Sequence, residues 1–162
     1  MSPLATRPRA FIETASLADA GEIAEIHARS FPAAWSEDEF TAFLDDNGII
    51  ALVIRVRRRL GKPHVAGFII CRSAGGEAEI LTVAVDPANR GKGYGRSLIE
   101  EAMRRLYHDR IEALFLEVDE TNVSALHLYR ALGFVQVAER KAYYADSAGR
   151  RTAALVMRFQ LR

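Results

Sequence analysis

The chain has 162 residues, of which 49% are hydrophobic and 27% are charged. This length suits a single domain over residues 1–162 with a well-buried core, and the composition excludes disordered and fibrous classes. The net charge of +1 gives no general attraction to polyanions. We therefore expect no DNA partner and no membrane partner.

Cys71 is the one cysteine of the sequence, so disulfide frameworks and cysteine-rich metal sites are excluded. A reducing cytoplasm is the expected compartment. The N-terminus has no apolar stretch typical of a signal peptide, and no window approaches about 18 apolar residues, so we expect neither export nor a membrane span. The histidines are scattered without ligand spacing, and we expect no metal at any of them: His27, His64, His108 and His127.

Apolar periodicity and turn residues predict the elements in chain order. They are a strand over 9–14, a helix capped by Ser16, a helix begun by Ser36 and Glu39, strands over 49–56, 64–72 and 77–85, a helix over 93–107, a strand over 111–118, a helix over 122–132 ended by Gly133, and strands over 134–144 and 152–160.

Three successive strands between residues 49 and 85 are joined by short turns, which predicts an antiparallel meander. The strand, helix and strand between residues 77 and 118 require a parallel crossover. The sequence therefore predicts an α+β fold, with a mixed, mostly antiparallel sheet and helices on both faces. The four arginines at 55–59 favour a solvated strand end and hairpin, and RNA contact is the alternative.

A glycine-rich loop lies between the strand ending at Val85 and the helix over 93–107. Glycines at 91, 93 and 95 allow successive backbone N–H groups to turn inward, and the helix N-terminus adds partial positive charge. Arg90, Lys92 and Arg96 add formal charge. The loop therefore predicts phosphate binding, against the alternative of a flexible loop that only starts a helix.

Two common phosphate loops do not match. No G-x-x-x-x-G-K-[ST] string occurs, so this is not a P-loop. A dinucleotide fingerprint has G-x-G-x-x-G directly after a strand, whereas this chain has G-x-G-x-G with five residues between Val85 and Gly91. Glu117 lies near the expected acidic position, but the antiparallel meander in the first half argues against a Rossmann domain.

The loop resembles the Q/R-x-x-G-x-G/A coenzyme loop of the GNAT superfamily of N-acetyltransferases, at Arg90, Gly93 and Gly95. Four further segments resemble one branch of this superfamily, the bacterial ribosomal-protein-alanine N-acetyltransferases. They are FPAAWSEDEF, EILTVAVDPANRGKGYGRSLI, LFLEVDETNVSALHLYRALGF and ERKAYY. The resemblance covers most of the chain and implies the GNAT acyl-CoA N-acyltransferase fold.

The resemblance implies acetyl-CoA as cosubstrate. The backbone of Val83, Ala84 and Val85 is expected to pair with the pantetheine arm like an added strand, and the Val85 N–H is the candidate oxyanion donor. The expected coenzyme contacts are Val83, Ala84, Val85, Arg90, Gly91, Lys92, Gly93, Tyr94, Gly95, Arg96 and Asn122. Without the resemblance, Asn122 is simply a good helix N-cap.

Acetyl transfer to an amine needs a base, because a protonated amine is no nucleophile. Glu117 follows an apolar run and matches the Glu of the family's LEV motif, which implies the general base, acting directly or through water. Tyr129 matches the family's acid and would protonate the departing thiolate. The structural alternative for Glu117 is a carboxylate at a solvent-exposed strand end. The alternative for Tyr129 is a core aromatic residue with its hydroxyl hydrogen-bonded.

Four aromatic residues are candidate walls of an acceptor groove: Phe31, Trp35, Tyr143 and Tyr144. Trp35 also fits a plain core role. The ribosomal branch is expected to have Pro before this Trp and acids ahead of the last strand, whereas this chain has Ala34 and Arg150-Arg151. An acceptor site for a protonated N-terminus should favour acids, so these departures bear on the acceptor only.

The leading hypothesis is acetylation of a protein or peptide N-terminus, with small-subunit ribosomal protein eighteen implied as substrate. The second is acetylation of a small amine such as a polyamine or an aminoglycoside. The third is a non-catalytic acyl-CoA binding module, which would keep the glycine loop without needing Glu117 or Tyr129.

Overall fold

A computed structural model describes residues 10–145 and 148–162. The chain divides into two compact units, the first comprising Met1–Ile70 and Val83–Glu101 and the second Cys71–Thr82 and Ala102–Arg162. The expectation of a single domain stays a prediction. No helix in the described part is long and apolar enough to cross a membrane.

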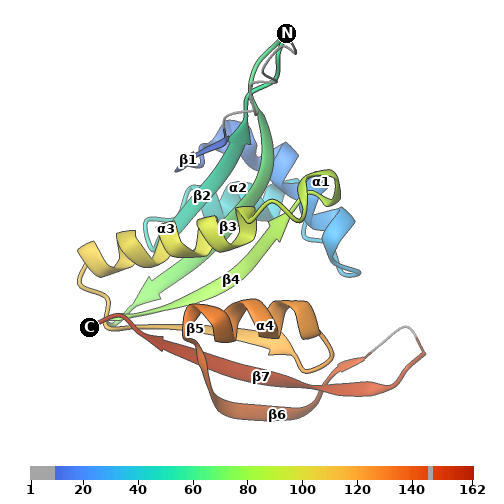
Figure 1. Ribbon diagram of the computed structural model, residues 1–162, viewed down its shortest axis with the longest axis vertical. Coiled ribbons are helices and arrows are strands. Elements are labelled where there is room, and N and C mark those ends of the chain that lie inside the picture. The colour runs from blue at the N-terminus through green and yellow to red at the C-terminus, as the bar shows by residue number, and fades with distance from the viewer. Residues whose placement is uncertain (1–9, 146–147) are drawn as a thin grey trace, which may run out of the picture. The chain divides into compact units, whose positions relative to one another are not determined.

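The described residues form thirteen helices and strands (Figure 1). In chain order they are β1 (Ala10–Thr14), the 3-10 helix η1 (Leu17–Asp19), α1 (Ala20–Ser30), α2 (Glu37–Leu44), β2 (Ile49–Val56), β3 (His64–Ala74), β4 (Glu77–Val85), the 3-10 helix η2 (Pro87–Asn89), α3 (Tyr94–His108), β5 (Ala113–Asp119), α4 (Val123–Leu132), β6 (Val135–Ala145) and β7 (Arg151–Gln160).

The strands are hydrogen-bonded in the order β1-β2-β3-β4-β5-β7-β6. Strands β4 and β5 are parallel, which confirms the predicted crossover, whereas β1–β2, β5–β7 and β6–β7 are antiparallel. The β3–β4 turn consists of Gly75 and Gly76, both with positive φ, as a two-residue hairpin requires. The α+β fold with a mixed, mostly antiparallel sheet is therefore confirmed.

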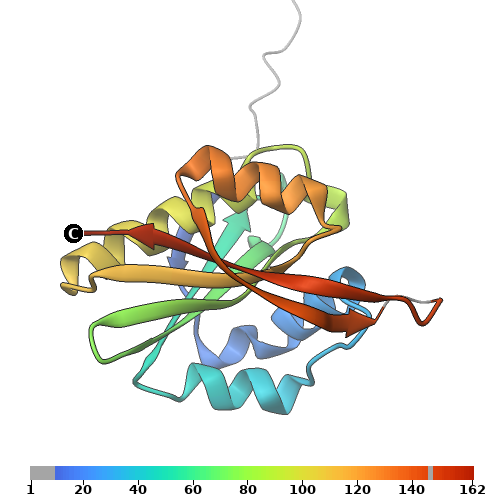
Figure 2. The ribbon, with the colours of Figure 1, turned by 90° about the horizontal axis from the view of Figure 1, so that it is seen from below.

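In the first unit, α1 and α2 pack against one another (Figure 2). The capping box that begins α2 is as predicted: Ser36 Oγ accepts from the Glu39 N–H at 3.2 Å, and the Ser36 N–H donates to Glu39 at 2.6 Å. The helix expected directly after Ser16 is instead divided. A 3-10 turn comes first because the buried Asp19 carboxylate is held by the Ser16 N–H and by Arg55.

The expectation of a solvated arginine cluster at 55–59 is wrong for Arg55. Its guanidinium donates to both Asp19 oxygens at 2.9 Å and pairs with Glu13. A charged group that is half-buried needs such partners. Arg57, Arg58 and Arg59 are exposed, as expected for a hairpin end.

In the second unit, β5 alternates buried Leu114, Leu116 and Val118 with half-buried residues, so one face lies against the core. The strand begins at Ala113 instead of residue 111, because Arg110 has φ 61° and the Ile111 N–H still donates to the Leu106 carbonyl. This left-handed residue ends α3 before the strand starts.

Helix α4 begins and ends where the sequence predicts. The Asn122 side chain caps its N-terminus by accepting from the Ala125 N–H at 3.3 Å. Gly133 at its C-cap has φ 103°, a conformation that strongly favours glycine.

Candidate functional site

The glycine loop, residues 86–96, lies in the first unit between β4 and α3. Gly91 and Gly93 have φ of 77° and 80°, and a Cβ on either would meet no atom within 4 Å. Glycine is therefore required there by backbone conformation, not by lack of space. The exposed stretch from Arg90 to Gly93 leads into the first turn of α3, where backbone N–H groups and the helix dipole favour an anion.

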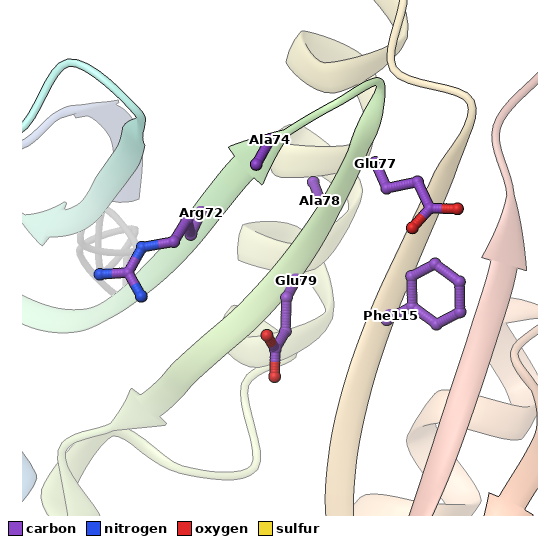
Figure 3. Close-up of a pocket in the computed structure, with 6 residues that line it drawn as sticks. All are labelled: Arg72, Ala74, Glu77, Ala78, Glu79 and Phe115. Atoms are coloured by element: carbon purple, nitrogen blue, oxygen red, sulfur yellow. The ribbon is translucent and has the colours of Figure 1, made fainter.

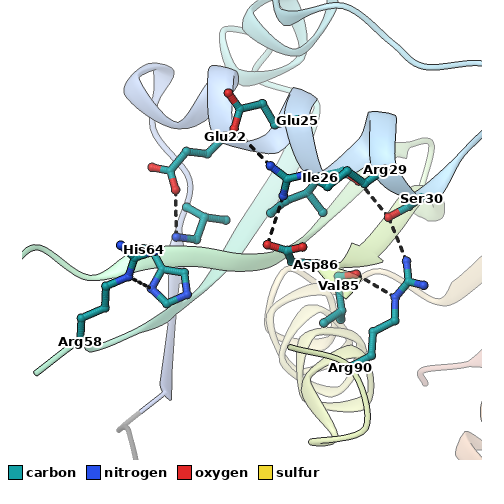
Figure 4. Close-up of polar contacts among 11 residues, drawn as sticks. Glu22, Glu25, Ile26, Arg29, Ser30, Arg58, His64, Val85, Asp86 and Arg90 are labelled. Atoms are coloured by element: carbon teal, nitrogen blue, oxygen red, sulfur yellow. Dashed lines mark hydrogen bonds and ion pairs between the residues drawn. The ribbon is translucent and has the colours of Figure 1, made fainter. Parts of the chain in front are cut away.

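The arginines of the loop have different hydrogen-bond and ion-pair partners. Arg96 pairs with Glu100 at 2.8 Å, one turn along α3. Arg90 turns back toward β4: its Nε donates to the Val85 carbonyl at 3.1 Å, and its second nitrogen donates to Ser30 Oγ at 3.2 Å (Figure 4). Sequence reasoning did not predict this link between β4 and the last turn of α1. A guanidinium has five N–H donors, so contact between Arg90 and a phosphate stays a prediction.

The end of β4 is fixed on one side and lacks strand partners on the other. The Asp86 N–H donates to the Ala66 carbonyl at 2.8 Å, and the Asp86 carboxylate pairs with Arg29 at 3.2 Å. The β4–β5 register ends at Ile80 and Leu116, so Leu81 and Thr82 continue without a ladder partner on β5.

The Thr82 hydroxyl near this point is a buried polar group. Its oxygen is buried and has no hydrogen-bond partner among the residues that the structure describes. Native proteins rarely leave buried polar groups unsatisfied, and an extended ligand with amide groups satisfies unpaired strand backbone. Pairing of the Val83, Ala84 and Val85 backbone with an amide-bearing arm such as pantetheine stays a prediction.

Glu117 lies on β5 in the second unit, with 21% of its side chain exposed. Its Oε1 is 3.0 Å from a nitrogen of Arg140 on β6, and the Arg140 guanidinium lies 5.8 Å from the centre of the Tyr143 ring. Sequence reasoning missed Arg140, because the two charges are 23 residues apart and only the sheet register brings them together. The ERKAYY string contained it without indicating a role.

A bulge in β6 shapes the surroundings of Glu117. The β6–β7 register shifts between Arg140 and Tyr144, and Ala142 has φ 54°, which strains a residue with a Cβ. Tyr143 and Tyr144 meet edge to face with ring centres 5.0 Å apart. Burial, with added repulsion from the Glu117 charge, raises the pKa of Tyr144. The structure therefore places both predicted acceptor tyrosines near Glu117.

Asp119, two residues beyond Glu117, is committed to local structure. It accepts from the Thr121 N–H and hydroxyl at 2.9 Å and from the Thr152 hydroxyl at 2.9 Å. Burial opposes ionisation, but these hydrogen bonds outweigh it and lower the pKa of Asp119. Glu117 is therefore the better candidate for a proton acceptor on this strand.

Tyr129 lies on α4 with 9% exposure, and its ring meets Phe134 edge to face at 5.8 Å. Burial raises the pKa of Tyr129 to about 12. The phenol is therefore protonated at neutral pH, as a proton donor must be, although it is a weaker acid than an exposed tyrosine. The Asn122 oxygen is occupied as the N-cap of α4, which leaves its amide N–H groups for a predicted coenzyme contact.

Phe31 and Trp35 lie in the loop after α1. Phe31 is 38% exposed, whereas Trp35 stacks on His27 with ring centres 4.9 Å apart and contacts Phe40 and Phe43. The backbone N–H of Trp35 donates to His27 Nδ1 at 3.1 Å. Burial lowers the pKa of His27, although the nearby negative charge of Glu39 opposes this shift. His27 is thus a neutral, packed acceptor, and the described residues hold no group of three metal-ligating side chains.

A hollow of about 330 Å³ lies on the second unit, and sequence reasoning did not indicate it (Figure 3). Its lining residues come from β3, β4 and β5: Arg72, Ala74, Glu77, Ala78, Glu79 and Phe115. Phe115 precedes Glu117 by two residues on β5, so both side chains lie on the same face of the strand. The hollow therefore opens on the face that carries Glu117.

Residues 20–134 match the model of the acetyltransferase (GNAT) family. The chain belongs to this family and is an acetyl-CoA-dependent N-acetyltransferase.

The chain is 31% identical over 150 residues to the ribosomal protein bS18-alanine N-acetyltransferase of Haemophilus ducreyi, covering 93% of this chain and 99% of the relative. It is 34% identical over 145 residues to that of Escherichia coli, covering 90% and 92%. The crystal structure of the Escherichia coli ribosomal-protein-S18-alanine N-acetyltransferase superposes with a TM-score of 0.84 at 28% identity, over 94% of each chain. Arabidopsis thaliana NAA60 shares the fold, with a TM-score of 0.83 at 19% identity over 94% of this chain and 98% of that chain.

Proposed function

We propose that the protein acetylates the α-amine of a protein N-terminus, with the N-terminal alanine of ribosomal protein bS18 as the substrate, in the cytoplasm. The observation that carries this proposal is the similarity to bS18-alanine N-acetyltransferases over nearly the whole of both chains. The position of Tyr143 and Tyr144 near Glu117 supports it, because aromatic walls hold a peptide at low entropic cost.

In the proposed reaction, acetyl-CoA supplies an acetyl group activated as a thioester. The neutral amine nitrogen attacks the carbonyl carbon, a C–N bond forms and the C–S bond breaks. Glu117 takes the proton that the amine loses, directly or through water, and Tyr129 gives a proton to the sulfur. The Val85 N–H donates to the carbonyl oxygen as it gains negative charge.

The Arg140 pair shapes the proposed role of Glu117. Arg140 faces Oε1 of the carboxylate, so the amine proton passes to the other oxygen. Arg151, which the sequence placed ahead of the last strand, is the first residue of β7, and its guanidinium donates to the Ala142 carbonyl at 3.3 Å. Its guanidinium therefore contacts the β6 bulge.

One observation favours a second function, acetylation of a small-molecule amine. Glu77 and Glu79 line the hollow on the same strand, and carboxylates attract cationic amines. Arg72 lines it too, which reduces that attraction.

A substrate panel separates these functions. The protein is given acetyl-CoA with a peptide beginning with alanine, the same peptide blocked at its N-terminus, a polyamine and an aminoglycoside, and release of free thiol is recorded. The proposal expects release with the open peptide and little with the others. Reaction with the polyamine or the aminoglycoside alone would establish the second function, and no release with any amine would leave a coenzyme-binding module.

A further inference from the structure

Gly67, on β3 in the first unit, lies close to the backbone of β4. A Cβ at this position would lie 2.9 Å from the Ala84 carbonyl oxygen, and 3.3 Å from side-chain carbons of Ile54 and Leu98. The two side chains can shift by a few tenths of an ångström. The carbonyl cannot shift alone, because it belongs to the backbone of β4.

The position of the Ala84 carbonyl sets the direction of the next N–H. In a planar trans peptide, the C=O and N–H bonds point in opposite directions. The Ala84 carbonyl approaches Gly67 on β3, so the Val85 N–H, which belongs to the same peptide, points away from β3.

The following peptide group, between Val85 and Asp86, is hydrogen-bonded through both its N–H and its C=O. Its N–H donates to the Ala66 carbonyl at 2.8 Å, and its carbonyl accepts from Arg90 at 3.1 Å. Arg90 is itself tied to Ser30 (Figure 4). A displacement at Ala84 is therefore not absorbed further along the chain, and it rotates the Ala84–Val85 peptide instead.

We propose that Gly67 is a positioning residue for acetyl transfer: having no side chain, it lets the Ala84 carbonyl lie against β3 and so aims the Val85 N–H at the thioester carbonyl. This inference rests on the proposed function, in which that N–H is the oxyanion donor. Gly67 touches no substrate and acts through the backbone of β4.

The test compares the wild-type protein with Gly67→Ala. Gly67→Ala is expected to turn the oxyanion donor away from the carbonyl oxygen and so to lower kcat about 10- to 100-fold. The Kd of coenzyme A should change less than about threefold, because coenzyme A does not use this N–H. A second measurement isolates the hydrogen bond. The wild-type protein should bind acetyl-CoA about three- to tenfold more tightly than S-ethyl-coenzyme A, which lacks the carbonyl, and Gly67→Ala should bring this ratio to about one.

Gly21→Ala is the matched control, because a Cβ there meets nothing closer than 3.6 Å. It should leave kcat and the binding ratio unchanged. The double variant Gly67→Ala with Leu98→Val removes one crowded side-chain contact and keeps the carbonyl contact. It is expected to recover thermal stability but not kcat, and it provides the same measurements if Gly67→Ala alone does not fold.

A wild-type binding ratio of one, or an unchanged ratio in Gly67→Ala, would overturn the inference. Recovery of kcat in the double variant would do so too, because packing would then explain the loss. The binding ratio needs no acceptor amine, so its result is separate from any failure of the peptide to react.

Discussion

The candidate residues of the two units are of different kinds. In the first unit, the glycine loop and the end of β4 present mainly backbone groups, set by the positive φ of Gly91 and Gly93 and by anchored peptides around Val85. In the second unit, the candidate groups are side chains: Glu117 and Tyr129, on different elements.

This difference separates the coenzyme, which is the same in every reaction, from the acceptor amine, which varies. Backbone N–H and C=O groups suit a ligand that is always the same, since they do not depend on side-chain identity. Side chains suit an acceptor that differs between relatives. Changes in the glycine loop should therefore appear mainly in the KM of acetyl-CoA, and changes at Glu117 and Tyr129 mainly in kcat.

The largest effect is expected from Glu117→Gln in the second unit. The amide has nearly the shape of the carboxylate but cannot take a proton, so kcat should fall about 100-fold or more while the KM of acetyl-CoA stays within a few-fold. Steady-state kinetics with an alanine peptide measure both. Glu139→Gln, an exposed change on β6, should alter neither. Equal activity of the two variants would remove Glu117 from the mechanism.

Tyr129→Phe should lower kcat by about 10- to 100-fold, because the proton donor is lost while the buried ring is kept. Since the pKa of Tyr129 is about 12, no ionisation of this group should limit the rate below about pH 10. Tyr107→Phe, at an exposed tyrosine of α3, is the matched control. A Tyr129→Phe protein with wild-type turnover would contradict the assignment of the acid.

In the first unit, Gly93→Ala should act on the coenzyme alone. The new Cβ meets no atom, so the cost is the strain of a positive φ, about 1 kcal/mol, and the KM of acetyl-CoA should rise about fivefold. Gly76→Ala carries a similar strain at φ 83° in the β3–β4 turn. It should lower stability to a similar extent with no change in KM. A loss confined to kcat in Gly93→Ala would contradict a role of the glycine loop in coenzyme binding.

The smallest effect concerns the loop after α1. The folded pKa of His27 is below its unfolded value of 6.5, so its contribution to stability is complete above about pH 6.5 and is lost as the pH falls through the folded pKa. His27→Asn keeps an acceptor near Nδ1 but does not titrate. It should be less stable at neutral pH, with a flatter decline in the free energy of unfolding as the pH falls below about 6.5.

Urea unfolding at several pH values measures this decline, and His127→Asn on the exposed side of α4 is the control. An identical decline in wild-type protein and in His27→Asn would mean that His27 does not carry this pH dependence.

The sequence predicted features that depend on neighbours in the chain. The capping box at Ser36, the end of α4 at Gly133 and the glycine loop each follow from a few adjacent residues. Contacts between distant segments left no such signal. The Asp19–Arg55 pair, the Glu117–Arg140 pair and the link from Arg90 to Ser30 join residues 23 to 60 positions apart. They arise only once strand register and helix packing are set.

The most direct test of the central claim is to locate the acetyl group on a peptide that begins with alanine and contains an internal lysine. Fragmentation mass spectrometry of the product identifies the modified nitrogen. The account predicts one acetyl group, on the N-terminal nitrogen, and little product with Glu117→Gln. Acetyl on the lysine alone, or product that forms equally well with Glu117→Gln, would contradict it.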